Sequence, residues 1–136
     1  MAIESCDDYK IKNDIIQSVP GVGNVVAFNL ISEMPELGYI NNKEASSLVG
    51  VAPFNRESGS YQGKRMIRGG RAQIRTAMYM AMMSAIQCNP VFKAKYQQLL
   101  EVGKPKKVAI IACIRKLVIT LNSMVRDGVY WDPKMN

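Results

Sequence analysis

Glycine and proline divide this sequence into short segments of helical character. The breaks fall around Pro20, Pro35, the glycine-rich stretch 50–70, Pro90 and Pro105. Proline ends or starts helices and glycine adopts the left-handed conformations of turns, so these positions limit how long each helix can run. We expect a mainly α protein, a helical bundle whose helices cover about Asp7 to Ser18, Gly23 to near Pro35, Lys43 to Val49, Arg71 to Gln87, Pro90 to near Gly103, and Pro105 onward.

Two side-chain patterns indicate how the later helices bury their surfaces. A stripe at three- and four-residue spacing in the segment 71–87 predicts a core-facing side: Ile74, Met78, Ala81, Met82 and Ala85. In the last helix a polar stripe leaves a wide apolar face for the core: Arg115, Lys116, Asn122, Ser123 and Arg126. Between the third and fourth helices we expect a glycine-rich loop or a small β-hairpin.

The charge of the chain is distributed unevenly. Its 136 residues, enough for one domain, include 18 Lys and Arg and 11 Asp and Glu, for a net charge of +7. The segment 1–57 holds four cations and eight acids, whereas 58–136 holds fourteen cations and three acids. Such a basic half is typical of proteins that bind nucleic acid or an anionic membrane.

Several classes of function are excluded by missing residue types. No histidine is present, so Ser-His-Asp, Cys-His and histidine-dependent zinc mechanisms are ruled out, and Cys6, Cys88 and Cys113 have no metal-binding spacing. The acidic N-terminus lacks the features of a signal peptide, and the apolar run from Val108 to Leu121 is too short and too charged to cross a bilayer. We therefore expect a cytoplasmic protein with no membrane partner and no metal site.

The first candidate site is SVPGVGNVVAFNL, residues 18–30. Pro20 ends one helix, and Gly21 and Gly23 allow a tight turn that leaves the first amides of the next helix available to a phosphate. This pattern indicates a helix-hairpin-helix element, which grips a nucleic-acid backbone. An ordinary helix-helix turn fits the same residues.

The second candidate is GKPKKVA, residues 103–109, where Lys104, Lys106 and Lys107 stand at the start of the last helix. Cations there oppose the helix dipole, at about 0.3–1 kcal/mol each, and a bound phosphate would offset that repulsion. The alternative is a solvated lysine cluster whose repulsion is screened by salt.

The third candidate is FNRESGSYQGKRMIRGGR, residues 54–71. Serines in such a stretch ordinarily make local turn hydrogen bonds. A serine becomes a nucleophile only where its proton is removed and the charge on its target is neutralised, and five cations stand close in sequence to clamp a phosphodiester: Arg56, Lys64, Arg65, Arg68 and Arg71. Phosphoryl transfer is the chemistry that this set can support.

Four blocks of the sequence resemble, in order, the C-terminal domain of Piv-type DNA invertases and the related insertion-sequence transposases. They are SVPGVG, LVGVAPFNRESGSYQGKRMIRGGRAQIRTAMYMA, NPVFKAKY and GKPKKVAIIACIRKLVITLNSMVRDG. The resemblance extends from about Asn13 to Asp132. It implies one transposase C-terminal domain over 1–136, with the helix-hairpin-helix at about 7–35, a serine loop at 50–70 and the helical bundle at 71–127.

The resemblance also implies a recombinase that acts on DNA through a serine. The serine of the A-P…S-G block, here Ser58, forms a 5′-phosphoserine link to a cut strand, and Ser60 is the weaker candidate because it lies outside the S-G pair. The charge partners are assigned by local chemistry to the five cations above, and Arg75 is added as a DNA contact. Members of this family include recombinases guided by a structured RNA.

Full-length members of that family carry an N-terminal RuvC-like domain with four acidic residues that hold Mg²⁺, and the active site forms between domains of different subunits. Glu4, Asp7, Asp8 and Asp14 do not replace such a tetrad and are expected to be a solvated helix start. We therefore expect the polypeptide alone to be catalytically incomplete, with no cofactor of its own, and to act with DNA, with a RuvC-like domain and as a homo-oligomer. A non-catalytic helix-hairpin-helix nucleic-acid-binding module is the main alternative, and a purely structural helical domain is a third.

Overall fold

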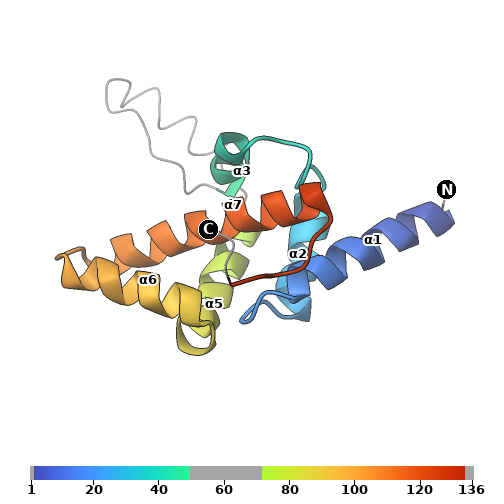
Figure 1. Ribbon diagram of the computed structural model, residues 1–136. Helices are drawn as coiled ribbons and strands as arrows, with labels where there is room; N and C mark the ends of the chain where they lie inside the picture. The colour runs from blue at the N-terminus through green and yellow to red at the C-terminus, as the bar shows by residue number, and fades with distance from the viewer. Residues whose placement is uncertain (1, 50–71, 134–136) are drawn as a thin grey trace, which may run out of the picture.

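The computed structural model describes residues 2–49 and 72–133 (Figure 1). Six helices form the regular secondary structure of these residues: α1 (Ala2–Gln17), α2 (Asn24–Glu33), α3 (Asn42–Val49), α5 (Ala72–Cys88), α6 (Pro90–Glu101) and α7 (Lys106–Asp127). The prediction of a mainly helical protein is confirmed. The glycine-rich loop or β-hairpin that was predicted over 50–70 lies outside the described residues.

The ends of α6 follow the local signals in the sequence. The Asn89 side chain accepts a hydrogen bond from the Val91 amide at 3.0 Å, and Pro90 occupies the first helical position, where its missing N–H costs nothing. At the other end Gly103 has a φ of 94°, and its amide and that of Lys104 donate back to carbonyls of the last turn of α6. The start of α1 was misplaced, because the helix begins at Ala2 and not near Asp7.

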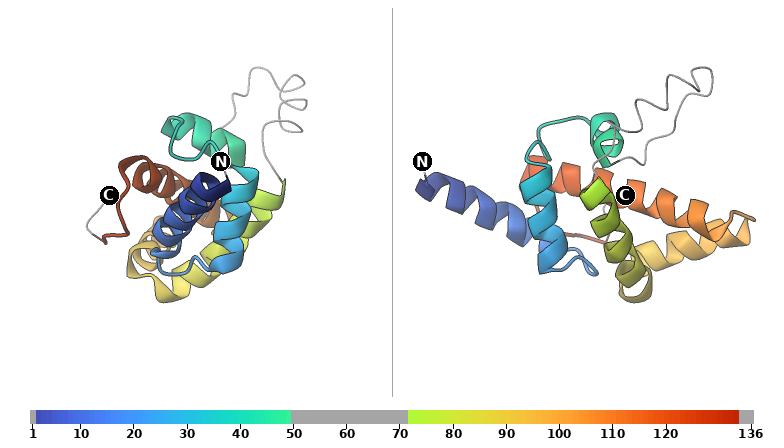
Figure 2. Two further views of the ribbon diagram at one scale, coloured as in Figure 1. Left: turned by 90° about the vertical axis from the view of Figure 1, so that its right-hand side faces the viewer. Right: turned by 180° about the vertical axis from the view of Figure 1, so that it is seen from behind.

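The core lies between α5, α7 and the helices packed around them. α5 contacts α2, α3, α6 and α7, and α7 contacts α1, α3, α5 and α6. The predicted core stripe of α5 is confirmed, since all five of its side chains are buried: Ile74, Met78, Ala81, Met82 and Ala85. Figure 2 shows α2 and α5 side by side on one face, with α6 and α7 forming an antiparallel pair that extends to one end.

α7 is the one helix of the described ranges 2–49 and 72–133 that is long and apolar enough to cross a membrane by length and composition, with a mean hydropathy of 1.8. Part of its apolar surface, 44% of the most apolar window, is buried inside the bundle, including Cys113, Ile114, Leu117, Val118 and Leu121. A core helix of a soluble protein has the same composition.

One residue of the predicted polar stripe on α7 was assigned to the wrong environment. Asn122 is fully buried. Its Oδ1 accepts from the Gly38 amide at 2.6 Å, and its Nδ2 donates to the Ile40 carbonyl at 2.8 Å. The side chain therefore satisfies backbone groups of the α2–α3 connection, which has no helix or strand of its own to do so.

The C-terminal segment contacts both Ser18, at the end of α1, and Phe92 of α6 through Trp131. The Trp131 amide donates to the Ser18 Oγ at 2.8 Å, and the Trp131 ring stacks on Phe92 with ring centroids 6.1 Å apart. Ser18 in turn donates to the Ile15 carbonyl at 2.6 Å. This segment holds the end of α1 against the start of α6.

Candidate nucleic-acid interface

Ser58 and five of the predicted charge partners lie outside the described residues: Arg56, Lys64, Arg65, Arg68 and Arg71. The structure does place the two helices that flank this stretch. α3 ends at Val49 and α5 begins at Ala72, and the two helices contact each other. Residues 50–71, which include Ser58, therefore connect two helices that contact each other.

Two sets of side-chain hydrogen bonds fix the position of α3. The Asn41 Oδ1 accepts from the Glu44 amide at 2.8 Å, and the Glu44 Oε1 accepts from the Asn41 amide at 3.0 Å, which is a reciprocal cap at the start of the helix. The buried Asn122 then holds the preceding segment against α7. The helix was predicted to start at Lys43 without use of this cap, which the letters NNKE could have indicated, whereas nothing in the sequence marked Asn122 as buried.

Arg75 is a predicted DNA contact that lies within the described residues. It lies in the first turn of α5, and its side chain is half-buried. Gln73 and Thr76 beside it are exposed. The first turn of α5 thus presents one cation close in sequence to the predicted nucleophile.

The α1–α2 turn has the conformation that its glycines allow. Gly21 has a φ of 101°, which an L-residue rarely adopts, and a Cβ added there would lie 2.7 Å from the Ala85 Cα. Its lack of a side chain therefore lets the turn pack against α5. The Asn89 Nδ2 also donates to the Pro20 carbonyl at 3.1 Å, so the turn is fixed to the α5–α6 junction.

Gly23 faces a different environment. It is exposed, and a Cβ there would meet no atom within 4 Å. It precedes α2, whose first turn has no side-chain cap and no acidic residue. Open space next to uncapped amides is compatible with an approaching phosphate, and equally with water. The predicted phosphate role thus fits Gly23 better than Gly21, which serves packing.

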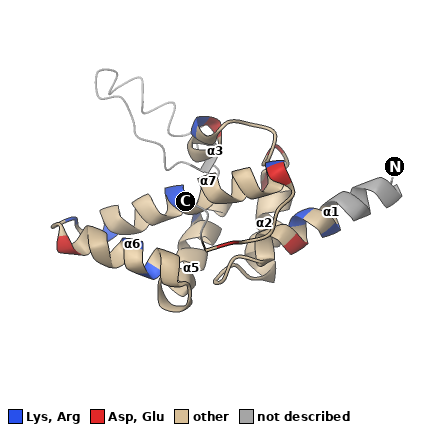
Figure 3. Ribbon diagram, in the orientation of Figure 1, with Lys and Arg blue, Asp and Glu red and all other residues tan. Residues whose placement is uncertain are grey.

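The α6–α7 connection carries the tip lysines, Lys104, Lys106 and Lys107, all exposed. They surround the start of α7, which has no acidic residue in its first turn and no side-chain cap. Figure 3 shows this tip at one end of the molecule and further Lys and Arg residues along α6 and α7.

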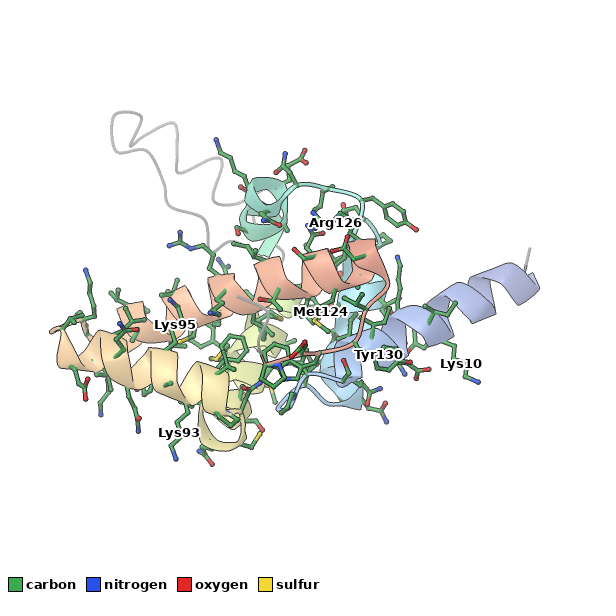
Figure 4. All side chains as sticks on the ribbon, in the orientation of Figure 1. Lys10, Lys93, Lys95, Met124, Arg126 and Tyr130 are labelled. Atoms are coloured by element: carbon green, nitrogen blue, oxygen red, sulfur yellow. The ribbon has the colours of Figure 1, made fainter. Side chains whose placement is uncertain are left out.

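Cations also flank the interior of the α6–α7 pair. Burial raises the pKa of the Cys113 thiol, and the positive charges of Lys95 and Lys116 partly offset that rise. Lys95 and Lys93 lie on α6 and differ in exposure, because Lys93 is exposed and Lys95 is half-buried (Figure 4). No role was predicted from the sequence for Lys93 or Lys95.

The α1–α2 turn and the tip lysines are not brought together. The α1–α2 turn packs on Ala85 near the end of α5, whereas the serine block joins the start of α5 at Ala72. A rise of 1.5 Å per residue separates these two positions by about 20 Å along the helix. The tip lysines lie at the free end of the α6–α7 pair (Figure 1).

Among residues 9–47 and 73–133, whose side chains the structure describes, no three His, Cys, Asp or Glu form a group that could hold a metal ion.

Comparison with known proteins gives one family match and several similar sequences. Residues 13–97 match the family described as "Transposase IS116/IS110/IS902 family". The chain is 27% identical over 123 residues to the insertion element IS110 uncharacterized 43.6 kDa protein of Streptomyces coelicolor, an alignment that covers 89% of this chain and 30% of that protein. No solved structure matches it significantly.

Two further relatives are pilin gene-inverting proteins. The protein of Moraxella lacunata is 24% identical over 138 residues, covering 98% of this chain and 43% of the relative. That of Moraxella bovis is 25% identical over 126 residues, covering 90% of this chain and 39% of the relative. The chain thus spans less than half the length of each of these relatives.

Proposed function

The chain belongs to the IS116/IS110/IS902 transposase family, and from that premise we propose that it is the serine-bearing domain of a DNA transposase or site-specific recombinase. The observation that carries the proposal is the extent of the family match. Residues 13–97 include most of the segment predicted as a helix-hairpin-helix, Ser58 and every predicted cation from Arg56 to Arg75. The resemblance of two relatives named for gene inversion supports a recombination role.

The proposed reaction is an exchange of one phosphodiester for another. The Ser58 Oγ attacks the phosphorus of the DNA backbone, the Oγ–P bond forms, and the bond from phosphorus to the 3′ oxygen breaks. The cut strand then carries a 5′-phosphoserine link, and the departing 3′ oxygen takes up a proton while the serine loses one. The cations around position 58 stabilise the charge that develops on the phosphorus oxygens.

This reaction needs a general base and a set of acidic side chains that hold Mg²⁺, and the sequence shows no clear candidate for either. There is no histidine to act as a base, and the acids near the start of α1 belong to one short stretch of helix. We propose that a RuvC-like acidic domain provides Mg²⁺ and completes the site. We also propose that a structured guide RNA takes part, that the active complex is a homo-oligomer, and that the protein acts in the cytoplasm.

The second candidate function is a non-catalytic nucleic-acid-binding module. It is favoured by the α1–α2 turn, with its exposed Gly23 and uncapped α2, and by the tip lysines. Neither feature requires Ser58. The two functions therefore differ in whether a covalent intermediate forms.

A trapping experiment separates them. The protein is incubated with nicked or branched DNA, with the RuvC-like domain of a full-length relative and Mg²⁺ added, and the products are run on a denaturing gel. The proposed function predicts a protein-DNA adduct that Ser58→Ala abolishes and that the matched variant Ser60→Ala retains. An adduct that survives Ser58→Ala would refute the assignment of the nucleophile.

A further inference from the structure

Positive charge is concentrated on one part of the described fold. Residues 90–127, which form α6, α7 and their connection, include eight Lys and Arg and two Asp and Glu. Residues 13–42, which include the α1–α2 turn and α2, contain no Lys or Arg. Figure 3 shows the same contrast, with cations along the α6–α7 pair and none on α2. A polyanion is therefore attracted to the α6–α7 pair more strongly than to the α1–α2 turn.

Three of these cations lie along the seam between α6 and α7. Burial raises the pKa of the Cys113 thiol, and the charges of Lys95 on α6 and Lys116 on α7 both act against that rise, so both lysines lie near this thiol. Lys106 precedes Cys113 by seven residues, or about two helical turns, and therefore lies on the same side of α7. We call Lys95, Lys106 and Lys116 the seam cations.

Lys95 and Lys116 are half-buried, whereas the tip lysines are exposed. A half-buried lysine packs its methylene stem against apolar neighbours and keeps its ammonium group in water. Such a side chain has less conformational freedom to lose when a phosphate binds. The acids of the helix pair lie elsewhere, since Asp127 pairs with Arg126 at 3.0 Å and Glu101 is about 120° around α6 from Lys95. The half-buried seam cations are thus suited to hold an anion in a fixed place.

Lys93 is a cation of the same helix that does not belong to the seam. It precedes Lys95 by two residues, which is about 200° of rotation around α6, so the two side chains leave the helix on opposite sides. Figure 4 shows Lys95 on the side of α6 next to α7 and Lys93 on the other side. Lys93 is also the more exposed of the two. The pair therefore separates an effect of position from an effect of charge.

The seam cations are spaced to follow a nucleic-acid backbone. Lys106 and Lys116 are ten residues apart on α7, which is about 15 Å along the helix axis. One strand of B-DNA carries a phosphate about every 3.4 Å along the duplex axis, so this distance covers about four phosphates. Lys95 and Lys116 come from different helices and approach the same place, which adds a second cation at one end of this line.

We propose that the seam cations bind the sugar-phosphate backbone of duplex DNA, so that Lys95 and Lys116 extend the contact of the tip lysines along the helix pair. The proposal rests on the DNA substrate of the proposed function, although not on its serine chemistry. Because phosphates are the same at every base pair, these contacts position the duplex on the chain without reading its sequence.

The test measures the affinity of the full chain for a short DNA duplex by fluorescence anisotropy, from about 50 to 200 mM NaCl. Lys95→Gln should reduce the steepness of log affinity against log salt by about 0.9, because one phosphate contact is lost. For affinities that are equal at about 1 M NaCl, this change corresponds to roughly eightfold weaker binding at about 0.1 M.

Matched substitutions show whether the position of the charge matters. Lys93→Gln removes the same charge from the other side of α6 and should leave the steepness unchanged. Lys95→Arg keeps the charge at the seam and should also leave it unchanged. Lys116→Gln provides a second variant if Lys95→Gln fails to fold by circular dichroism.

A chemical footprint tests the contact directly. The chain is treated with an amine-acetylating reagent with and without the duplex, and the modified lysines are identified by mass spectrometry. We expect DNA to slow the acetylation of Lys95 and Lys116 and to leave that of Lys93 unchanged, because a bound phosphate covers the ammonium groups at the seam.

Three outcomes overturn the proposal. One is an equal change of steepness for Lys93→Gln and Lys95→Gln, which would mean that net charge and not the seam determines binding. Another is acetylation of Lys95 at the same rate with and without DNA. The third is binding or protection by an RNA duplex of the same sequence but not by the DNA duplex, in which case the seam would belong to an RNA site. Adduct formation by Ser58 is measured separately, with the RuvC-like domain and Mg²⁺, so a failure here is distinguishable from a failure of the proposed function.

Discussion

Replacing Gly21 by alanine tests how the α1–α2 turn is joined to the bundle. Two costs are expected in the folded state. A non-glycine residue at a φ of 101° carries about 1–3 kcal/mol of backbone strain. The new Cβ would also lie 2.7 Å from the Ala85 Cα, a backbone atom that cannot turn aside, and such overpacking adds about 1–3 kcal/mol.

The sum is a loss of about 2–6 kcal/mol in the free energy of unfolding, out of the ~5–15 kcal/mol that is usual for a domain. Chemical denaturation with urea, followed by circular dichroism at 222 nm, measures it. With a slope of roughly 2 kcal/mol per molar, a loss of ~4 kcal/mol lowers the midpoint by about 2 M.

Two other glycines separate the contributions. Gly103→Ala has a similar φ of 94° but no atom within 4 Å of the new Cβ, so it should show the strain alone. Gly23→Ala has an ordinary φ and open space, and should change stability by at most about 1 kcal/mol through its position before α2.

A Gly21→Ala variant that is no less stable than Gly103→Ala would refute the close approach of the turn to α5. Adding Ala85→Gly to Gly21→Ala should recover part of the loss, because it removes the Cβ at 2.8 Å but leaves the Cα at 2.7 Å.

Four further predictions concern other parts of the fold. Asn122→Ala should lower the free energy of unfolding by about 2–4 kcal/mol, measured by the same denaturation, because it strands the buried Gly38 amide and a carbonyl. Changing the three tip lysines to glutamine should weaken duplex DNA binding, and should reduce the slope of log affinity against log salt by about 2.7 if each lysine contacts a phosphate. The control Lys10→Gln, on α1, should leave this slope unchanged. Equal effects of the two changes on the slope would place the phosphate contacts elsewhere. Cys88 should react at once with a thiol reagent and Cys113 only when the bundle opens. The pKa of the Cys113 thiol is raised in the folded protein by burial. The contribution of this thiol to the free energy of unfolding is therefore complete below the ordinary thiol pKa of about 8.5 and is lost as pH rises through the folded pKa. Cys113→Ala should abolish this loss.

Most of the helix boundaries could be predicted because they depend on neighbouring residues. Asn89 and Pro90 start α6 as expected, and the left-handed Gly103 follows its end. The core stripe of α5 was also predictable, since one helical period brings its residues to one side. The start of α1 is the exception, because it was predicted near Asp7 and lies at Ala2. The pattern of apolar residues there is too weak to indicate a helix.

The candidate sites were predictable only in part. The exposed tip lysines and the glycine turn are where the sequence placed them, but their separation across the bundle was not foreseen. The phosphate contact predicted for Gly21 stays a prediction, and the structure adds that the missing side chain of Gly21 allows close contact with Ala85. The assignments of Ser58 and its five neighbouring cations stay predictions, because they lie outside the described residues.

Local sequence by itself determined where this chain is helical and which side of α5 is apolar, because hydrogen bonds four residues apart and helical periodicity are properties of short segments. Only the tertiary structure decided which polar groups are buried. The hydrogen bonds from Asn89 to Pro20, from Gly38 to Asn122 and from Trp131 to Ser18 join residues 69, 84 and 113 positions apart. No local pattern specifies such pairs, because each exists only when packing brings a backbone group without a partner next to a distant side chain that can satisfy it.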